Sequence, residues 1–169
     1  SPEVCYDYVG DLKGWEIIEG KNCYNSSFLD FALERTRDTI ELSGAEFLKT
    51  GKGEVIVVTD PHFNTLLVHE IVGHPTESDR ILKMETAYAG RSWLFKNMDE
   101  NQIGKRIASP LVNAFSDPTV MGYGYYKYDA EGTPAKRIEV IKNGILNTFL
   151  NGRENAATLE QEPNGSMRA

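Results

Sequence analysis

Two hydrophobic patterns follow one another in the first half of the chain. Between residues 27 and 49, apolar and small residues recur at helical spacing, with charged residues largely on the other side. Ser27, with Asp30 three residues later, resembles a capping signature, so an amphipathic helix that covers a sheet is predicted. Residues 54–59 form a β-branched run bounded by turn residues, which predicts a buried strand.

Two further helices are predicted beyond that strand. The first runs from about Phe63 to Gly73, after a turn at Asp60-Pro61. The second covers about residues 78–89. A weak alternation predicts at most one short strand at residues 15–19, and residues 90–110 are predicted to be irregular.

The second half changes to strands and turns. Asn143-Gly144 is the strongest two-residue hairpin signal in the chain. Strands are predicted at residues 111–115, 137–142 and 145–150, and a helical turn at 154–159. The tyrosine-rich residues 123–128 favour a half-exposed strand, with a peptide groove as the alternative. The class is therefore α+β, with a helix–strand–helix part in residues 1–90 and antiparallel β-hairpins in residues 91–169.

Length and charge narrow the class of protein. At 169 residues the chain is expected to form a single unit. Its net charge of −7 and lack of a basic patch argue against nucleic acid as a partner. No apolar run is long enough to span a bilayer, so no membrane role is expected. Cys5 and Cys23 form no C-x-x-C, which favours a reduced, cytoplasmic state.

The chemistry of the chain concentrates in one stretch, Leu67 to Pro75. It contains His69 and His74, with Glu70 directly after the first histidine. Two neutral imidazoles can hold a divalent ion, and an adjacent carboxylate can accept a proton from the bound water. The stretch therefore predicts a metal site, with a helix end carrying a capping and a core histidine as the alternative.

The two histidines are five residues apart, and this spacing needs an explanation. In a straight α-helix, residues five apart are separated by roughly 140° around the axis, so they cannot share one ion. Gly73 favours a helix end, and Pro75 pushes His74 out of the α region. We therefore expect the helix to stop at about Gly73 and His74 to turn back toward His69.

A catalytic site of this kind needs a third protein ligand. His62, just before the motif helix, is a minor candidate against the commoner role of a solvated turn histidine. Glu77 and Asp79 are expected either to orient the histidines or to cap the next helix. Glu85 is a weaker ligand candidate.

Beyond this stretch, the chain resembles the TldD/PmbA family of metallopeptidases. The resemblance runs in order over residues 27–169. It rests on residues 69–74, 77, 79, 116–118, 129–135, 141–146, 153–156 and 164–168. Because His69, Glu70 and His74 are all present, the chain resembles the TldD side of the family, whose members keep the metal site.

The resemblance implies a zinc-dependent endopeptidase that acts on unstructured peptides as a homodimer or heterodimer. It implies that His69 and His74 are ligands, that Glu70 is the general base, and that the third ligand is a Cys near the family's C-terminus. This chain has no Cys after Cys23 and opens on Ser1 rather than Met. We therefore expect a piece of a longer protein that carries the missing ligand. The alternative function is a non-catalytic scaffold or dimerisation module with an incomplete metal site.

Overall fold

The residues that the structure describes form helices and a three-stranded antiparallel sheet, which confirms the predicted α+β class. The computed structural model describes residues 12, 14–20, 27–47, 49, 51–84 and 90–168. The chain divides into two compact units, Ser1–Ile56 and Val57–Ala169, and the predicted change near residue 90 falls inside the second. Within the described ranges, every helix is too short or too polar to cross a membrane.

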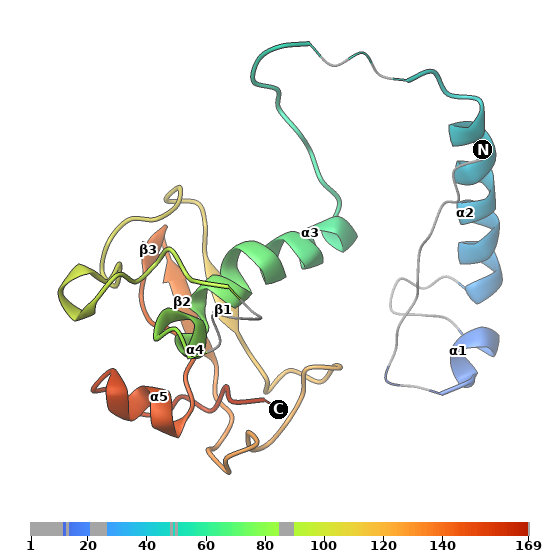
Figure 1. Cartoon of the computed structure of the whole chain (residues 1–169). Helices are drawn as coiled ribbons and strands as arrows, with labels where there is room; N and C mark the ends of the chain where they lie inside the picture. The colour runs from blue at the N-terminus through green and yellow to red at the C-terminus, as the bar shows by residue number, and fades with distance from the viewer. Residues whose placement is uncertain are drawn as a thin grey trace. The chain divides into compact units, whose positions relative to one another are not determined.

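The first unit holds helices α1 (Glu16–Glu19) and α2 (Phe28–Ser43), drawn in blue in Figure 1. The Ser27 hydroxyl accepts the backbone N–H of Asp30, and the Asp30 carboxylate accepts the backbone N–H of Ser27. This reciprocal pair satisfies two N–H groups at the helix start, and it confirms the predicted cap.

Three predictions in this part of the chain were wrong in detail. Helix α2 ends at Ser43 instead of residue 49, and α1 occupies the place of the short strand predicted at residues 15–19. Residues 54–59 belong to no helix or strand, and Ile56 is 97% and Val58 93% exposed. A β-branched run forms a strand only where another strand pairs with it, and the described residues provide no such partner here.

The second unit carries the predicted motif helix and all three strands. Its elements are α3 (Pro61–Val68), η1 (His69–Gly73), η2 (His74–Thr76), α4 (Ser78–Ile81), η3 (Met98–Glu100), β1 (Ala114–Ser116), β2 (Ile138–Lys142), β3 (Ile145–Leu146) and α5 (Arg153–Thr158). The strand order is β1-β2-β3, with both pairings antiparallel. The predicted strands and the helical turn near residue 154 are confirmed, although β1 and β3 are shorter than expected.

The tight turn between β2 and β3 is the predicted hairpin. Asn143 and Gly144 both have positive φ, at 49° and 76°, as a type I′ turn requires. The tyrosine segment instead forms turns with a single bridge from Tyr128 to Pro134, so the predicted strand there was wrong. The helix predicted at residues 78–89 is also shorter, because α4 ends at Ile81; residues 85–89, with Glu85, lie outside the described residues.

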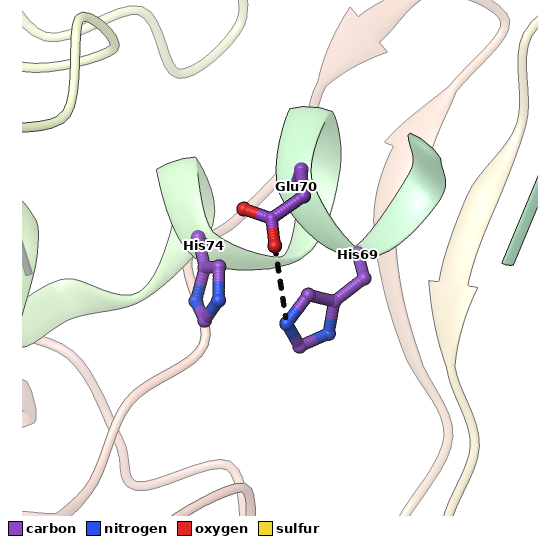
Figure 2. Close-up of side chains that lie close together, drawn as sticks. All are labelled: His69, Glu70 and His74. Carbon is purple, nitrogen blue, oxygen red and sulfur yellow. Dashed lines mark ion pairs between the residues drawn. The ribbon is translucent and has the colours of Figure 1, made fainter. Parts of the chain in front are cut away.

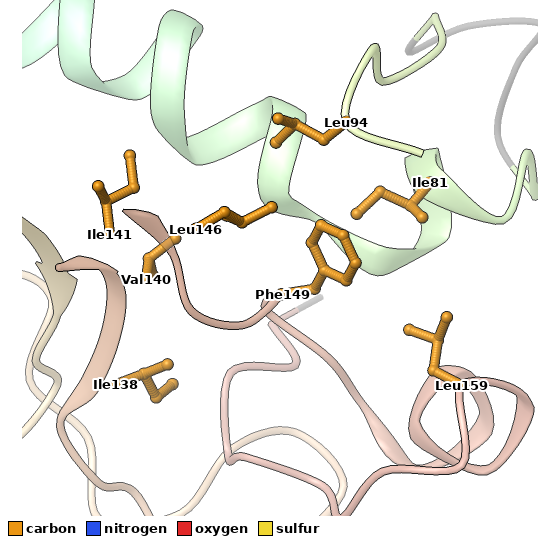
Figure 3. Close-up of a cluster of buried hydrophobic side chains, with 8 residues drawn as sticks. All are labelled: Ile81, Leu94, Ile138, Val140, Ile141, Leu146, Phe149 and Leu159. Carbon is orange, nitrogen blue, oxygen red and sulfur yellow. The ribbon is translucent and has the colours of Figure 1, made fainter. Parts of the chain in front are cut away.

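A buried apolar cluster attaches the helical segment to the sheet (Figure 3). Its members come from α4, β2, β3 and the loops beside them: Ile81, Leu94, Ile138, Val140, Ile141, Leu146, Phe149 and Leu159. Ile81 is 1% and Phe149 0% exposed. Each such side chain contributes roughly 1.5–3 kcal/mol, whereas a four-residue helix has little stability of its own. Packing on the sheet therefore holds α4 in place.

Two glycines with positive φ provide a matched test of this turn geometry. An alanine Cβ at Gly144 would lie 2.4 Å from the Ala108 carbonyl oxygen, whereas at Gly132 it would meet nothing within 4 Å. Gly132→Ala should cost about 1–2 kcal/mol from the left-handed backbone alone. Gly144→Ala should cost about 2–5 kcal/mol because overpacking adds about 1–3 kcal/mol. Urea unfolding measures both, and equal losses would contradict the close approach at Gly144.

Candidate metal centre

A single widened helical turn brings the two motif histidines together. Helix α3 is α-helical up to Val68, and residues His69–Gly73 then form one π-helical turn. The backbone N–H of His74 donates to the carbonyl oxygen of His69, five residues earlier. This i→i+5 bond accommodates the extra residue of the motif, so two side chains that an α-helix would separate by roughly 140° lie on one side.

The π turn ends at Gly73, where the helix was expected to stop, but the expected departure of His74 from the α region was wrong. Gly73 (φ −56°) and His74 (φ −57°) are both in the right-handed helical region, and the chain continues as the 3-10 turn η2. Pro75 lies inside that turn and does not push His74 out of helical geometry. The Thr76 hydroxyl donates to the carbonyl oxygens of Val72 (2.7 Å) and Gly73 (2.9 Å), in the turn just before it. The extra residue is therefore absorbed within the helix instead of ending it.

The three motif side chains point toward one another, as Figure 2 shows. One donor atom from each of His69, Glu70 and His74 lies within 4.8 Å of the others. The two imidazole rings are 4.2 Å apart between centroids and inclined at 74°, and His69 Nε2 is 3.9 Å from Glu70 Oε1. The side chain of His69 is 59% exposed and that of His74 25% exposed, so solvent reaches the cluster.

The donor set fits a zinc-like ion. Zinc binds imidazole nitrogen at about 2.0–2.1 Å in a tetrahedral arrangement. In enzymes, three protein ligands and one water fill its four positions. Two such ligands are then about 3.4 Å apart, and the donor atoms of the cluster lie within 4.8 Å of one another. Within the part of the chain that the structure describes, no other group of three potential ligands comes together.

The remaining candidate ligands are placed apart from this cluster or lie outside the described residues. His62 is exposed in the first turn of α3 and is not a member of the cluster. Cys5, Cys23 and Glu85 lie outside the described residues. The described part of the chain therefore brings together two imidazoles and one carboxylate.

Of the two acids after the motif, the structure brings Glu77 to the site. Its carboxylate oxygens lie 2.9 and 3.0 Å from His74 Nδ1, and its side chain makes no capping bond to α4. Asp79 instead accepts the backbone N–H of Arg80 at 2.8 Å. The guanidinium Nε of Arg80 pairs with Oε2 of Glu77. Arg80 had no predicted role, although its i,i+3 spacing from Glu77 was a usable signal.

The tyrosine segment lies on a separate feature, a shallow hollow of about 390 Å³ whose lining includes Tyr125, Tyr126 and Tyr128. Burial raises the pKa of Tyr126, and its hydroxyl donates to the Gly165 carbonyl oxygen at 2.8 Å. This tyrosine therefore ties the hollow to the C-terminal turn.

Comparisons with known proteins connect this geometry to one family. Residues 52–169 match the model of the PmbA/TldA metallopeptidase C-terminal domain. The chain is 34% identical over 144 residues to Metalloprotease MJ0996 of Methanocaldococcus jannaschii, covering 85% of this chain and 29% of that protein. It is 38% identical over 117 residues to a metalloprotease of Methanothermobacter thermautotrophicus, covering 69% and 23%.

A third relative carries zinc in its name. The chain is 32% identical over 120 residues to the zinc metalloprotease TldD homolog of Saccharolobus solfataricus, covering 69% of this chain and 24% of that protein. The chain thus spans between 23% and 29% of the length of these three relatives.

The Thr76 hydroxyl should stabilise the π turn measurably. Thr76→Val keeps the shape of this buried side chain but removes its bonds to two carbonyl oxygens, so it should destabilise the chain by about 1–3 kcal/mol. Thr76→Ser keeps the hydroxyl and should cost about 0.8 kcal/mol, for one methyl group. Urea denaturation compares the two variants. A Val variant as stable as the Ser variant would show that the hydroxyl is not needed.

Proposed function

Because the chain belongs to the PmbA/TldD family of metallopeptidases, we propose that it carries the catalytic site of a zinc-dependent endopeptidase. Its substrates are unstructured or partly unfolded peptides. The single observation that supports this most strongly is the π turn, in which donor atoms of His69, Glu70 and His74 lie within 4.8 Å of one another. The zinc assignment draws on the imidazole donors and on the printed name of the Saccharolobus relative.

Each motif residue has a role in this proposal. His69 and His74 hold the ion through ring nitrogens. When bound, zinc supplies a Lewis acid that lowers the pKa of its water and polarises the scissile carbonyl. A Glu70 carboxylate oxygen accepts the proton of that water and passes it to the nitrogen of the leaving amine. The exposure of His69 and Glu70, 59% and 57% for their side chains, leaves room for a peptide beside the cluster.

An extended substrate also has a sheet edge that it can use. Strand β1 is the end strand of the described sheet, and Phe115 on it is 53% exposed. A peptide that pairs with such an edge must first be unfolded, which fits the proposed substrate class. The proposal also includes a third metal ligand, a cysteine outside this chain. It further includes a homodimer or heterodimer as the assembly and the cytoplasm as the location.

A second candidate function follows from the donor count. The described residues bring together two imidazoles and a carboxylate, whereas a catalytic zinc site has three protein ligands besides water. The chain taken alone would then be a non-catalytic scaffold or dimerisation module. A carboxylate directly beside a ligand favours the enzyme, because a purely structural site has no use for a proton acceptor.

Glu70→Gln tests the role of the general base. In the full-length protein that carries this segment, it should lower casein hydrolysis at least about 100-fold, since a positioned acid–base group contributes roughly 10²–10⁴-fold. Zinc content, measured by plasma mass spectrometry, should stay at the wild-type value because both imidazoles remain. Residual hydrolysis within a few-fold of wild type would exclude Glu70 as the base, and inert wild-type protein with zinc bound would favour the scaffold function.

The three histidines of the chain provide a matched test of the ligand set. His69→Ala and His74→Ala should each lose zinc and casein hydrolysis together, because each removes one imidazole donor. His62→Ala removes the same group at the exposed start of α3 and should keep both. Zinc retained in the His74 variant, or lost in the His62 variant, would show that the ligands are assigned wrongly.

A further inference from the structure

We propose that Arg80 and Glu77 are positioning residues that hold His74 in its Nδ1–H tautomer, which leaves Nε2 free to bind a metal. The proposal rests on the proposed function, since it assumes that His74 is a ligand. It adds two residues that do not touch the ion and assigns each of them a task. The three side chains follow one another in the order Arg80, Glu77, His74, and each contacts the next.

The contacts in this series are short and partly shielded from water. Both carboxylate oxygens of Glu77 reach His74 Nδ1, at 2.9 and 3.0 Å, and Oε2 also accepts from Arg80 Nε. The side chains of Arg80, His74 and Glu77 are 20%, 25% and 34% exposed. A carboxylate between two nitrogen groups at this burial is more ordered than one on an open surface.

The backbone beneath this series is fixed to the core. The N–H of Leu150 donates to the Thr76 carbonyl oxygen at 2.8 Å, and the N–H of Ser78 donates to the Leu150 carbonyl oxygen at 2.9 Å. Glu77 lies between these two bonds, opposite Leu150 in a parallel bridge. Ile81, one residue after Arg80, is 1% exposed in the core cluster. The carboxylate therefore starts from a backbone position that cannot shift easily.

The chemistry of a carboxylate then selects the tautomer of His74. An ionised carboxylate only accepts hydrogen bonds, so the neutral ring facing it must carry its hydrogen on Nδ1. Nε2 is then left with a free lone pair for a metal. Arg80 Nε donates to Oε2, one of the two oxygens that reach His74 Nδ1, and so holds the carboxylate in this orientation. His69 has no equivalent support from Glu70, since 3.9 Å is beyond hydrogen-bond length.

Glu77→Gln should disturb this arrangement in a specific way. The amide oxygen of glutamine accepts from Arg80 Nε, which turns the NH₂ group toward His74. That group donates to Nδ1 and forces the hydrogen onto Nε2, where it blocks the metal. Loss of such a carboxylate partner costs roughly 10- to 100-fold in metal affinity. Arg80→Met should produce a smaller loss, and Arg80→Lys, which keeps the cation, should restore part of it.

The first measurement is zinc affinity of the full-length protein by competition with a chromogenic chelator. The matched control is Glu100→Gln, which makes the same change to an exposed carboxylate paired with Lys96. We expect zinc binding to weaken roughly 10- to 100-fold for Glu77→Gln and to stay unchanged for the control. Equal affinity in the two variants would overturn the proposal.

The second measurement needs neither metal nor activity. At mildly alkaline pH, ¹⁵N spectra of the metal-free chain report which ring nitrogen of His74 carries the hydrogen. We expect Nδ1–H in the wild type and the control, and a shift toward Nε2–H in Glu77→Gln. An unchanged tautomer would overturn the proposal. If Glu77→Gln lowers the helical circular dichroism signal, the same spectra of Arg80→Met decide instead. A His74 signal from the Nδ1–H tautomer alone in that variant would contradict the role proposed for Arg80. If the wild type binds zinc and Glu77→Gln shows the tautomer shift, but the wild type hydrolyses nothing, the proposed function alone is refuted.

Discussion

The hydrogen bond from the His74 N–H to the His69 carbonyl oxygen is the constraint on which the candidate site depends. With regular α-helical bonding, the two imidazoles would diverge by roughly 140°, and no rotation of side chains would let them share an ion. One widened turn removes that divergence while both residues keep helical backbone angles. A π turn within a helix is uncommon, and it is often found at functional sites. Here its effect is explicit, because it converts a spacing of five into a shared face.

Such a turn needs support from outside the helix. The single hydrogen of the buried Thr76 hydroxyl is shared between the carbonyl oxygens of Val72 and Gly73, and the Thr76 carbonyl oxygen in turn accepts the N–H of Leu150. Phe149, next to Leu150, is fully buried in the core cluster. The candidate site is therefore supported by Phe149 and Leu150, which lie far beyond it in the sequence. The short helix α4 contributes through the packing of Ile81.

This dependence explains what could be predicted from the sequence. The cap at Ser27 and the Asn143-Gly144 turn have local causes, namely a reciprocal pair of hydrogen bonds and two positive φ angles, and both were predicted correctly. The strand at residues 54–59 was predicted wrongly, because a β-branched run needs a pairing partner that its own sequence does not specify. At the motif, the sequence correctly excluded a straight helix. The sequence pattern did not distinguish a break at Gly73 from a π turn. The turn is supported by hydrogen bonds of Thr76 and of the distant Leu150, which the motif alone does not specify.

The two histidines differ as candidate ligands, and the difference follows from their surroundings. His74 is three-quarters buried and contacts Glu77, which Arg80 also holds, whereas His69 is mostly exposed and lies 3.9 Å from Glu70. Ordering an exposed side chain on binding costs conformational entropy. His74 is already ordered by its contact with Glu77, so it would lose less conformational entropy than His69. An incoming ion would therefore find one fixed imidazole and recruit the second. Because Glu70 lies 3.9 Å from His69 and is not hydrogen-bonded to it, its carboxylate would stay available for the proton transfer proposed above, while His74 would supply the fixed ligand.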